Sequence, residues 1–357
     1  MLPFLVIARD YSYAAVTGIT LAATLLSSLV QPVFGALTDR RPMPWLIAAG
    51  PLVAGAGIGL AGVGEAYAFT WAAIALSGIG VAAYHPEAAR SARIASGGTA
   101  RGMSYFSVAG IVGIASAPLL VAPVLGTFGV TATPLLAIPA ACAAAVLVPA
   151  LLWLRRRRLR AGPRKPPPAV DRRDDWRSFG FLTSAVIARS ILYFGLLSFV
   201  ALYLIHELGA STAVGSVALA TFIASGSVGA LIGGALADRF GRVRTLRIGY
   251  LAAAPCVLGL VLAPNLSVAF VVVAVLGLAS FLPFAVQVTL GQEYLPHRVG
   301  TASGVTLGLA MSIGGLAAPL FGMLADAYDL RVALTVLVAF PLVSLLLTTR
   351  LRDVRAV

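Results

Sequence analysis

A succession of apolar runs, each about 20 residues long, constrains the fold of this chain more than any other feature. A hydrocarbon layer of about 30 Å is crossed by about 20 residues of helix, which rises about 1.5 Å per residue. Because lipid offers no partner for backbone N–H and C=O groups, each run must satisfy its own hydrogen bonds as a helix. Charged residues make up only 11% of the chain, against about 25% in soluble domains. The sequence therefore predicts an all-α integral membrane protein.

The apolar runs predict eleven complete membrane spans. A further apolar stretch, residues 1–7, precedes them and is too short to cross a bilayer. We interpret it as the remnant of a truncated first helix, so that each half of the chain would hold six helices. The predicted spans are 14–37, 45–64, 67–86, 103–125, 133–153, 179–204, 213–236, 246–264, 267–290, 300–325 and 331–349.

The basic residues indicate how the spans are oriented. The net charge of +13 could suggest nucleic acid, but 23 of the 26 Lys and Arg residues lie in alternate connections and in the C-terminal tail. This asymmetry predicts that those connections and the C-terminus are cytoplasmic, in a multi-pass protein of the cell membrane. The longest connection, 154–178, could bind anionic lipid, although a solvated hinge is the simpler interpretation. No fold signature for nucleic acid accompanies the arginines.

Two short motifs recur at nearly the same spacing. Residues 35–40 read Gly-Ala-Leu-Thr-Asp-Arg, and residues 234–239 read Gly-Ala-Leu-Ala-Asp-Arg, 199 positions later. The triplet Ala-Pro-Leu at 117–119 also recurs, 201 positions later. The spacing indicates a duplication and predicts two bundles, 1–153 and 179–357, joined by the basic linker 154–178. Facing repeats of this kind hold a carrier's binding site between them.

The repeated motif suggests a gate. A carboxylate followed by arginines, at a tight turn between helices, can pair with a neighbouring helix end and release it when the bundles move. Such charge–dipole contacts contribute about 1 kcal/mol each, which biases two conformations without locking either. Simple turn and topology chemistry is the alternative, but topology alone requires no acid. The candidate gating residues are Gly35, Asp39, Arg40, Gly234, Asp238, Arg239, Gly241 and Arg242.

Arg189 is predicted to lie near the bilayer midplane, ten residues into a helix that begins near Phe179. An arginine at that depth costs at least about 2.5–3.5 kcal/mol, so it should face the protein interior and have a partner. No Asp or Glu falls at comparable depth in the predicted helices. An anionic substrate, an acid on the missing first helix, or backbone carbonyls together with Tyr193 could be that partner. We take Arg189 and Tyr193 as candidate substrate-binding residues.

Three ionisable residues near helix ends are candidates for proton coupling. Glu87 and His85 close the third predicted span, and Glu293 closes the ninth. Carboxylates at a membrane edge can take up protons near neutrality, although all three groups are interfacial by depth. The sequence has no phosphate-binding Gly-x-x-x-x-Gly-Lys-Ser/Thr loop. We therefore expect no ATP-driven step, no enzyme activity, no cofactor and no metal.

The motifs resemble those of known transporters. The Gly-x-x-x-Asp-Arg loops, placed after the second and eighth helices of a twelve-helix plan, resemble the signature of the major facilitator superfamily. Within that resemblance, three stretches are similar to the fosmidomycin-resistance-type efflux proteins. They are Tyr-His-Pro-Glu-Ala-Ala-Arg at 84–90, the segment 189–196, and Gly-Gln-Glu-Tyr-Leu-Pro at 291–296 running into 302–310.

The resemblance implies a secondary active transporter with two pseudo-twofold related bundles and alternating access. It implies export of a drug or an anionic compound such as a phosphonate antibiotic, by proton antiport, and we expect a monomer. Two departures stand out: the first helix is almost wholly missing, and Ala117 stands where glycine is usual. A proton-coupled importer of a small metabolite and a non-transporting, N-terminally truncated membrane protein remain as alternatives.

Overall fold

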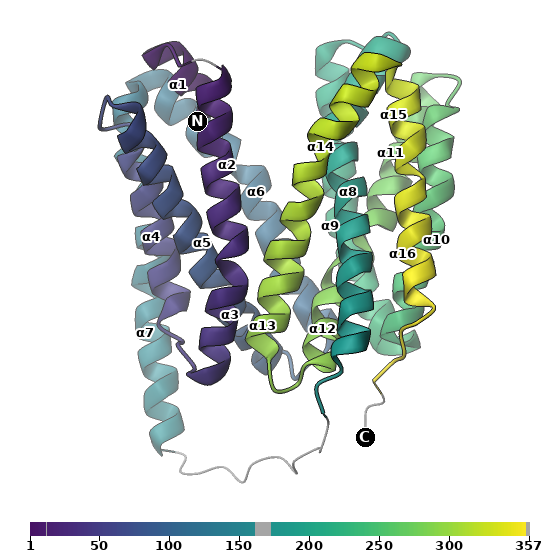
Figure 1. Ribbon diagram of the computed structural model, residues 1–357. Helices are drawn as coiled ribbons and strands as arrows, with labels where there is room; N and C mark the ends of the chain where they lie inside the picture. The colour runs from purple at the N-terminus through teal and green to yellow at the C-terminus, as the bar shows by residue number, and fades with distance from the viewer. Residues whose placement is uncertain (12, 161–172, 355–357) are drawn as a thin grey trace. The chain divides into compact units, whose positions relative to one another are not determined.

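The computed structural model describes residues 1–11, 13–160 and 173–354, and within these ranges it contains helices and connections but no strand. Figure 1 shows the helices running roughly parallel or antiparallel to their neighbours. The helices before the basic linker are α1 Leu2–Arg9, α2 Tyr13–Leu29, α3 Gln31–Arg40, α4 Leu46–Leu60, α5 Tyr67–Ala95, α6 Ala100–Phe128, the 3₁₀-helix η1 Val130–Ala137 and α7 Ile138–Arg160. The helices after it are α8 Trp176–Glu207, α9 Thr212–Phe240, α10 Arg242–Val261, α11 Leu266–Phe281, α12 Phe284–Tyr294, α13 Val299–Gly304, the π-helix η2 Val305–Leu309, α14 Ala310–Ala327, α15 Leu330–Leu337 and α16 Ala339–Thr348.

Ten helical segments in the described part of the chain are long and apolar enough to cross a membrane. The eleven predicted spans each coincide with helix, but the span predicted at 45–64 contains an apolar helix of only 15 residues, Leu46–Leu60. The count of eleven is therefore not confirmed. The all-helical membrane architecture is confirmed, because the apolar runs fold as continuous helices or as helices with a short interruption.

Side-chain caps set the beginning of several helices. Asp175 accepts a hydrogen bond from the backbone N–H of Ser178 at the start of α8. The first N–H groups of a helix lack a partner inside the helix, and a short polar side chain supplies one. Ser211, Asn265 and Asp329 do the same at the starts of α9, α11 and α15. The polar residues between the apolar runs therefore determine where these spans begin.

The chain divides into two compact units. Unit 1 contains Met1–Ser91, Gly113–Asp174 and Pro296–Gly308. Unit 2 contains Ala92–Val112, Asp175–Leu295 and Leu309–Val357. Each unit thus includes a short segment from the opposite half of the sequence. The bundle boundaries drawn above at 1–153 and 179–357 stay a prediction.

In unit 1, α4 packs against α7 and η1, and α3 packs against α13. The buried Thr133 of η1 links this unit's turns, because its hydroxyl donates to the carbonyl of Gly59 at 2.8 Å and accepts from the N–H of Gly62 at 2.9 Å. One threonine thereby satisfies two backbone groups at the end of α4, where water is scarce.

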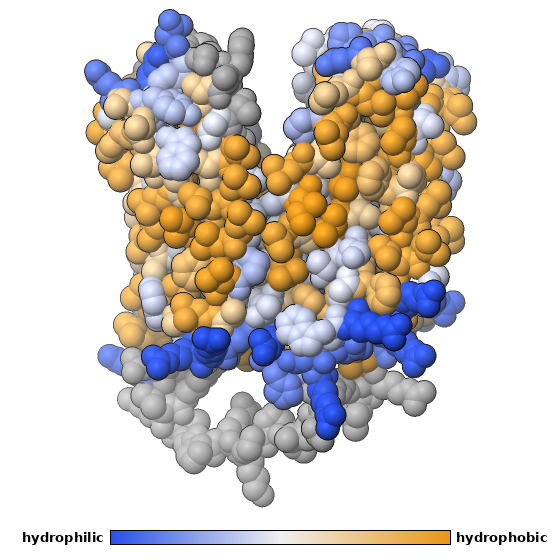
Figure 2. All heavy atoms as spheres, in the orientation of Figure 1, coloured by the Kyte–Doolittle hydropathy of each residue, from blue (hydrophilic) through white to orange (hydrophobic). Residues whose placement is uncertain are grey.

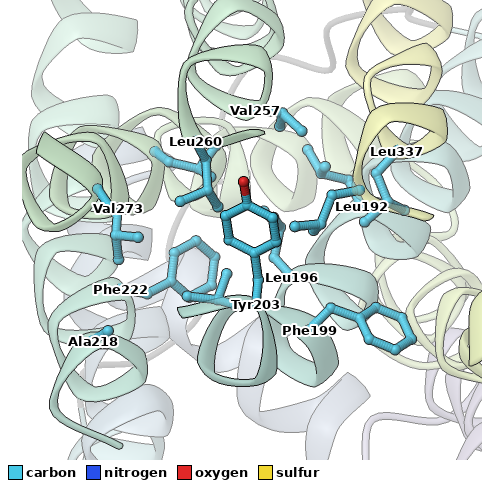
Figure 3. Close-up of a cluster of buried hydrophobic side chains, with 14 of the residues drawn as sticks. Leu192, Leu196, Phe199, Tyr203, Ala218, Phe222, Val257, Leu260, Val273 and Leu337 are labelled. Atoms are coloured by element: carbon cyan, nitrogen blue, oxygen red, sulfur yellow. The ribbon is translucent and has the colours of Figure 1, made fainter. Parts of the chain in front are cut away.

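In unit 2, α8 lies at the centre and packs against α9, α14 and α16. Its apolar face forms the main core with α9, α10 and α11, which Figure 3 shows around Tyr203. The Tyr203 ring is surrounded by Leu196, Phe222 and Leu260, and its hydroxyl donates to the carbonyl of Val261 at 2.8 Å. This core holds α8 rigidly and so determines where its one buried cation lies.

The outer faces of the helices are apolar. Figure 2 shows hydrophobic side chains over most of the visible helix length in each unit, with hydrophilic side chains gathered at the helix ends. Leu119 on α6 is 75% exposed, and Leu346 on α16 is 68% exposed. Apolar surface of this extent is stable in lipid and not in water. The chain is therefore a multi-pass membrane protein.

Candidate functional site

Arg189 lies in the middle of α8, 13 residues after Trp176, and its side chain is 1% exposed. The prediction that it faces the protein interior is confirmed by this burial. One terminal nitrogen, Nη1, donates to the backbone carbonyl of Ser280 at 3.4 Å, and the other, Nη2, donates to the sulfur of Met311 at 3.0 Å. The guanidinium carbon lies 5.2 Å from the centre of the Phe284 ring.

These contacts leave Arg189 incompletely satisfied. Its Nε atom is buried and has no hydrogen-bond partner among the described residues, and the same is true of the Ser280 hydroxyl. A thioether sulfur is a weak acceptor, and a ring face attracts a cation by only about 0.5–2 kcal/mol. No carboxylate contacts Arg189 in the described part of the chain. The buried cation therefore retains the capacity to bind an anion.

Close helix packing brings Met311 to this position. A Cβ atom at Gly314 would lie 2.4 Å from the backbone carbon of Ser190, so only glycine lets α14 approach α8 this closely. Met311 is three residues earlier on α14, and its sulfur also accepts from the Ser190 hydroxyl at 3.1 Å. The small residues that the sequence placed in this helix thus serve helix contact.

Tyr193 lies one turn after Arg189 on α8 and interacts with it electrostatically. Its ring is edge-on to Phe281 at 5.4 Å between ring centres and stacks with Phe222 at 6.4 Å. Arg189 and Tyr193 therefore share one face of the helix, as residues four apart do. The structure brings together the two residues that the sequence singled out as a binding pair.

Two further polar residues near Arg189 were missed by sequence reasoning. Tyr250 of α10 interacts with Arg189, and the Gln287 side-chain amide of α12 donates to the Tyr250 hydroxyl at 3.1 Å. Both residues are 2% exposed. A glutamine inside a long apolar run was a signal that could have found this pair, because buried amides must be hydrogen-bonded. We call Arg189, Tyr193, Tyr250, Ser280, Phe284, Gln287 and Met311 the Arg189 cluster.

Asp39, at the end of α3, caps the start of α13. Its Oδ1 atom accepts from the N–H of Gly300 at 2.6 Å, and its Oδ2 atom accepts from the N–H and the hydroxyl of Thr301 at 2.8 and 2.7 Å. The negative carboxylate meets the unpaired N–H groups and positive dipole end of a helix from the opposite half of the sequence. We call this contact the Asp39 cap; it lies within unit 1.

Asp238, at the end of α9, caps the start of α6 in the same way. Its two oxygens accept from the N–H groups of Ala100 and Arg101 at 2.8 and 2.9 Å. This Asp238 cap lies within unit 2. The helix starts that the two aspartates cap are themselves 200 positions apart, at 100–101 and 300–301. Both copies of the motif therefore make the same contact.

The motif glycines make the two caps possible. A Cβ atom at Gly35 would lie 2.4 Å from the carbonyl oxygen of Gly300. At Gly234 it would lie 2.7 Å from the Ser104 hydroxyl and 2.8 Å from the carbonyl oxygen of Ala100. Each glycine stands one turn before its aspartate, so a larger residue would push the helix start away from the carboxylate.

The second motif copy has additional contacts. Gly241 has a φ of 95°, a backbone conformation that favours glycine. Asp353 then caps α10 by accepting from the N–H groups of Arg242 and Val243 at 2.8 and 2.9 Å. The Arg242 side chain pairs with Glu293 at 2.9 Å and donates to the carbonyl of Gly98 at 3.0 Å. The structure thus joins Glu293 to the motif rather than to Glu87.

The arginines that directly follow the motif aspartates lie at the surface. Arg40 and Arg239 are both exposed, and the guanidinium carbon of Arg239 lies 5.1 Å from the centre of the Phe240 ring. Neither side chain takes part in the hydrogen bonds of its cap in the described structure. The aspartates and glycines of the motif therefore form the caps, without these two side chains.

Glu87 lies near the Asp39 cap. It is 3% exposed, and its Oε2 atom has no hydrogen-bond partner among the described residues. That atom lies 3.8 Å from Nη1 of Arg90, and the same Nη1 donates to the carbonyl of Thr38 at 2.7 Å. Glu87 and Asp39 also interact electrostatically. Glu87 is therefore linked through Arg90 to the residue that precedes Asp39.

His85 does not join this arrangement. Its Nδ1 atom shares a hydrogen bond with the carbonyl of Val81 at 2.9 Å, within α5, and its ring is edge-on to Tyr84. Among the described residues there is no group of three or more His, Cys, Asp or Glu side chains that could hold a metal ion.

Comparison with known proteins is consistent with this architecture. The chain is 30% identical over 334 residues to the fosmidomycin resistance protein of Escherichia coli (strain K12), which covers 92% of this chain and 82% of the relative. It is 29% identical over 357 residues to the uncharacterized MFS-type transporter YfnC of Bacillus subtilis (strain 168), covering 97% and 86%.

Solved structures share the fold. The transporter FucP in the outward conformation superposes with a TM-score of 0.74 at 14% identity, covering 95% of this chain and 90% of that one. A bacterial homologue of the iron transporter ferroportin, in the outward-facing state, superposes with a TM-score of 0.72 at 16% identity, covering 97% and 92%. The sequence itself matches the Major Facilitator Superfamily over residues 1–319. The chain therefore belongs to the major facilitator superfamily of transporters.

Proposed function

We propose that this transporter exports a small anionic compound, of the phosphonate class, in exchange for protons. The single observation that carries the proposal is Arg189, a buried guanidinium that has, among the described residues, no partner for its Nε atom and no carboxylate in contact with it. An uncompensated cation inside a membrane protein is costly and marks a substrate path. The name of the relative that confers resistance to fosmidomycin, a phosphonate, supports the same class of substrate.

An anion at Arg189 would replace weak contacts by strong ones. The Nη2 atom of Arg189 donates to the thioether sulfur of Met311, and this flexible side chain can move aside. A phosphonate oxygen forms charge-assisted hydrogen bonds with guanidinium, which are about twice as strong as neutral ones. Tyr193 interacts electrostatically with Arg189, and the Ser280 hydroxyl is unpartnered among the described residues, so we propose both as further donors. The site thus favours the anion over the empty state.

Glu87 is the proposed proton-coupling residue. Its carboxylate shares Arg90 with the carbonyl of Thr38, so its charge affects the backbone that carries Asp39. Protonation of Glu87 would remove its attraction for Arg90, which would then contact only the carbonyl of Thr38. It would also remove the negative charge that interacts with Asp39. Glu293, which is paired with Arg242, is proposed to act in the gate and not as a proton carrier.

The two aspartate caps are the proposed gate. Both hold a helix start from the opposite half of the sequence, and both lie on the side that the distribution of arginine assigns to the cytoplasm. Alternating access requires contacts that form in one state and break in the other. Two capped helix ends, each contributing about 1 kcal/mol, provide a reversible closure.

Reconstituted vesicles test the direction and the coupling. We expect protein in liposomes to move fosmidomycin against its gradient when an opposing proton gradient is imposed, and Arg189→Leu to abolish this flux at equal protein content. Movement of fosmidomycin together with protons would instead support the importer. Absence of any flux, with a correctly folded protein, would support a non-transporting membrane protein.

A glutamate variant tests the proton step separately. Glu87→Gln keeps the shape of the side chain and removes its charge, so we expect counterflow exchange of fosmidomycin to persist while proton-driven transport is lost. The matched variant is Glu65→Gln, which changes a carboxylate outside the described helices and should leave both activities unchanged. Proton-driven transport in Glu87→Gln at the wild-type rate would remove Glu87 from the mechanism.

A further inference from the structure

Gln287 is a neutral residue at a place where the other repeat has an acid. Counting back 200 positions from Gln287 reaches Glu87, and counting back 200 from the neighbouring Phe284 reaches Tyr84. Each pair therefore presents an aromatic residue and, three positions later, a residue of the same length ending in either a carboxylate or an amide. The second repeat thus differs from the first by one charge at this position.

Gln287 lies near Arg189, so a carboxylate at this position would affect the charge of the Arg189 cluster. Phe284, whose ring lies 5.2 Å from the guanidinium carbon of Arg189, is three residues earlier on α12. Residues three apart share one face of a helix, so Gln287 is directed toward the same cluster. Its amide N–H donates to the Tyr250 hydroxyl at 3.1 Å, and Tyr250 in turn interacts with Arg189.

The hydrogen bond from Gln287 also orients Tyr250. Because the tyrosine oxygen accepts from the amide, its own proton is free to be donated in another direction. The Arg189 cluster then contains three kinds of donor: the guanidinium, the Tyr250 hydroxyl and the Ser280 hydroxyl, which is unpartnered among the described residues. None of the seven residues that define the cluster carries a carboxylate. Such a set fits a group with several negative oxygens.

We propose that Gln287 is a specificity-determining residue, which keeps the Arg189 cluster free of negative charge and sets Tyr250 as a donor, so that the site selects compounds with a phosphonate or phosphate group over carboxylates. This inference rests on the proposed binding of an anion at Arg189. A phosphonate offers three oxygens to donors from separate helices, whereas a carboxylate offers two in one plane. A site built from buried donors rejects a ligand that leaves some of them unpaired.

Binding to purified protein tests the role of Gln287. The probe is fosmidomycin, and its displacement by methylphosphonate and by acetate gives the selectivity. In Gln287→Glu, we expect affinity for fosmidomycin to fall by about 10-fold or more at about pH 8, because a carboxylate competes for Arg189.

A neutral variant keeps the proposal testable if the glutamate variant does not fold. Gln287→Met has a similar volume without the amide, so we expect the ratio of methylphosphonate to acetate affinity to fall several-fold, with no new pH dependence. Wild-type selectivity in Gln287→Met, or wild-type affinity at about pH 8 in Gln287→Glu, would overturn the role of Gln287. Undiminished fosmidomycin binding in Arg189→Leu would instead overturn the proposed anion site itself.

Discussion

Arg189 combines features that are rarely found together in one residue. Its side chain is almost completely buried, its Nη atoms contact a carbonyl and a thioether, and its Nε atom is unpartnered among the described residues. A structural arginine in a membrane protein normally has its donors satisfied, because an unpaired polar group in an apolar setting costs free energy. The proposed binding role of Arg189 rests on this incomplete satisfaction.

Substitution by lysine should separate charge from geometry at this residue. Arg189→Lys retains the positive charge but replaces a planar fork by a single ammonium group. We expect fosmidomycin to bind about 10-fold more weakly, since one charge-assisted hydrogen bond is worth about 1.5 kcal/mol. Isothermal titration on purified protein measures the change. Equal affinities of Arg189→Lys and the wild type would mean that charge alone is recognised.

At the scale of the element, the two aspartate caps depend on backbone approach. At Gly35 the three atoms nearest to an added Cβ are all backbone atoms of α13, the closest at 2.4 Å, while at Gly234 the nearest atoms are the Ser104 hydroxyl at 2.7 Å and the Ala100 carbonyl oxygen at 2.8 Å. Backbone atoms move only with their helix, and the approach at Gly35 is the closer of the two. The two glycines of the repeated motif should therefore tolerate substitution unequally.

We expect Gly35→Ala to reduce the rate of transport more than Gly234→Ala does. The Cβ atom would separate α3 from α13 and lengthen the hydrogen bonds of Asp39. Exchange of fosmidomycin across vesicles measures the rate, and Gly113→Ala is the control, because nothing lies within 4 Å of its added Cβ. A wild-type rate in Gly35→Ala would show that the close contact of the two helices has no part in transport.

The Asp175 cap of α8 should stabilise the folded protein to an extent that depends on pH. Burial by itself would raise the pKa of Asp175, but hydrogen bonds from Ser178 and the backbone of Arg177 outweigh it and hold the pKa below its usual value of 3.8. A lowered pKa in the folded state means that the stabilisation is fully present above about pH 4 and is lost as the pH falls through the folded value.

We therefore expect Asp175→Ala to lower the free energy of unfolding by about 1 kcal/mol at neutral pH, as loss of an N-cap does. The difference from the wild type should shrink as the pH falls below about 4. Thermal unfolding in detergent at several pH values measures both effects. Asp175→Asn, which can still accept a hydrogen bond, should lose less stability than Asp175→Ala and show little dependence on pH.

At the scale of the whole molecule, the duplication gives the chain two equivalent caps. The Asp39 cap and the Asp238 cap each join a motif from one half of the sequence to a helix start from the other half. If transport requires both to open in the same step, their contributions to the barrier should be coupled. Contacts that act independently would instead show additive effects.

We expect Asp39→Asn and Asp238→Asn each to change the turnover rate by several-fold while altering the dissociation constant of fosmidomycin far less. An amide keeps one acceptor oxygen but loses the charge that meets the helix dipole. Rates from vesicle exchange and affinities from titration, measured on both single variants and the double variant, form a cycle that detects coupling. Unchanged turnover in both single variants would reject the gating role.

Much of this protein follows from one-dimensional patterns. Runs of apolar residues imply helices because lipid leaves the backbone no other partner, and the repeat at 39 and 238 identifies the motif without any coordinates. The burial of Arg189 was also predictable, since the cost of exposing a guanidinium to lipid is large. These features depend on composition and spacing alone.

The contacts across the sequence were decided only by the tertiary structure. Nothing in a linear pattern indicates that Asp39 caps residue 300, that Glu293 pairs with Arg242, or that Gln287 holds Tyr250 beside Arg189. Each contact joins residues of different helices, whose relative rotation depends on side-chain packing such as the approach at Gly314. The helices and the motif follow from the order of the amino acids, because they depend on local hydrogen bonding and solvation. The tertiary structure decided which polar groups meet, because that depends on packing between distant segments.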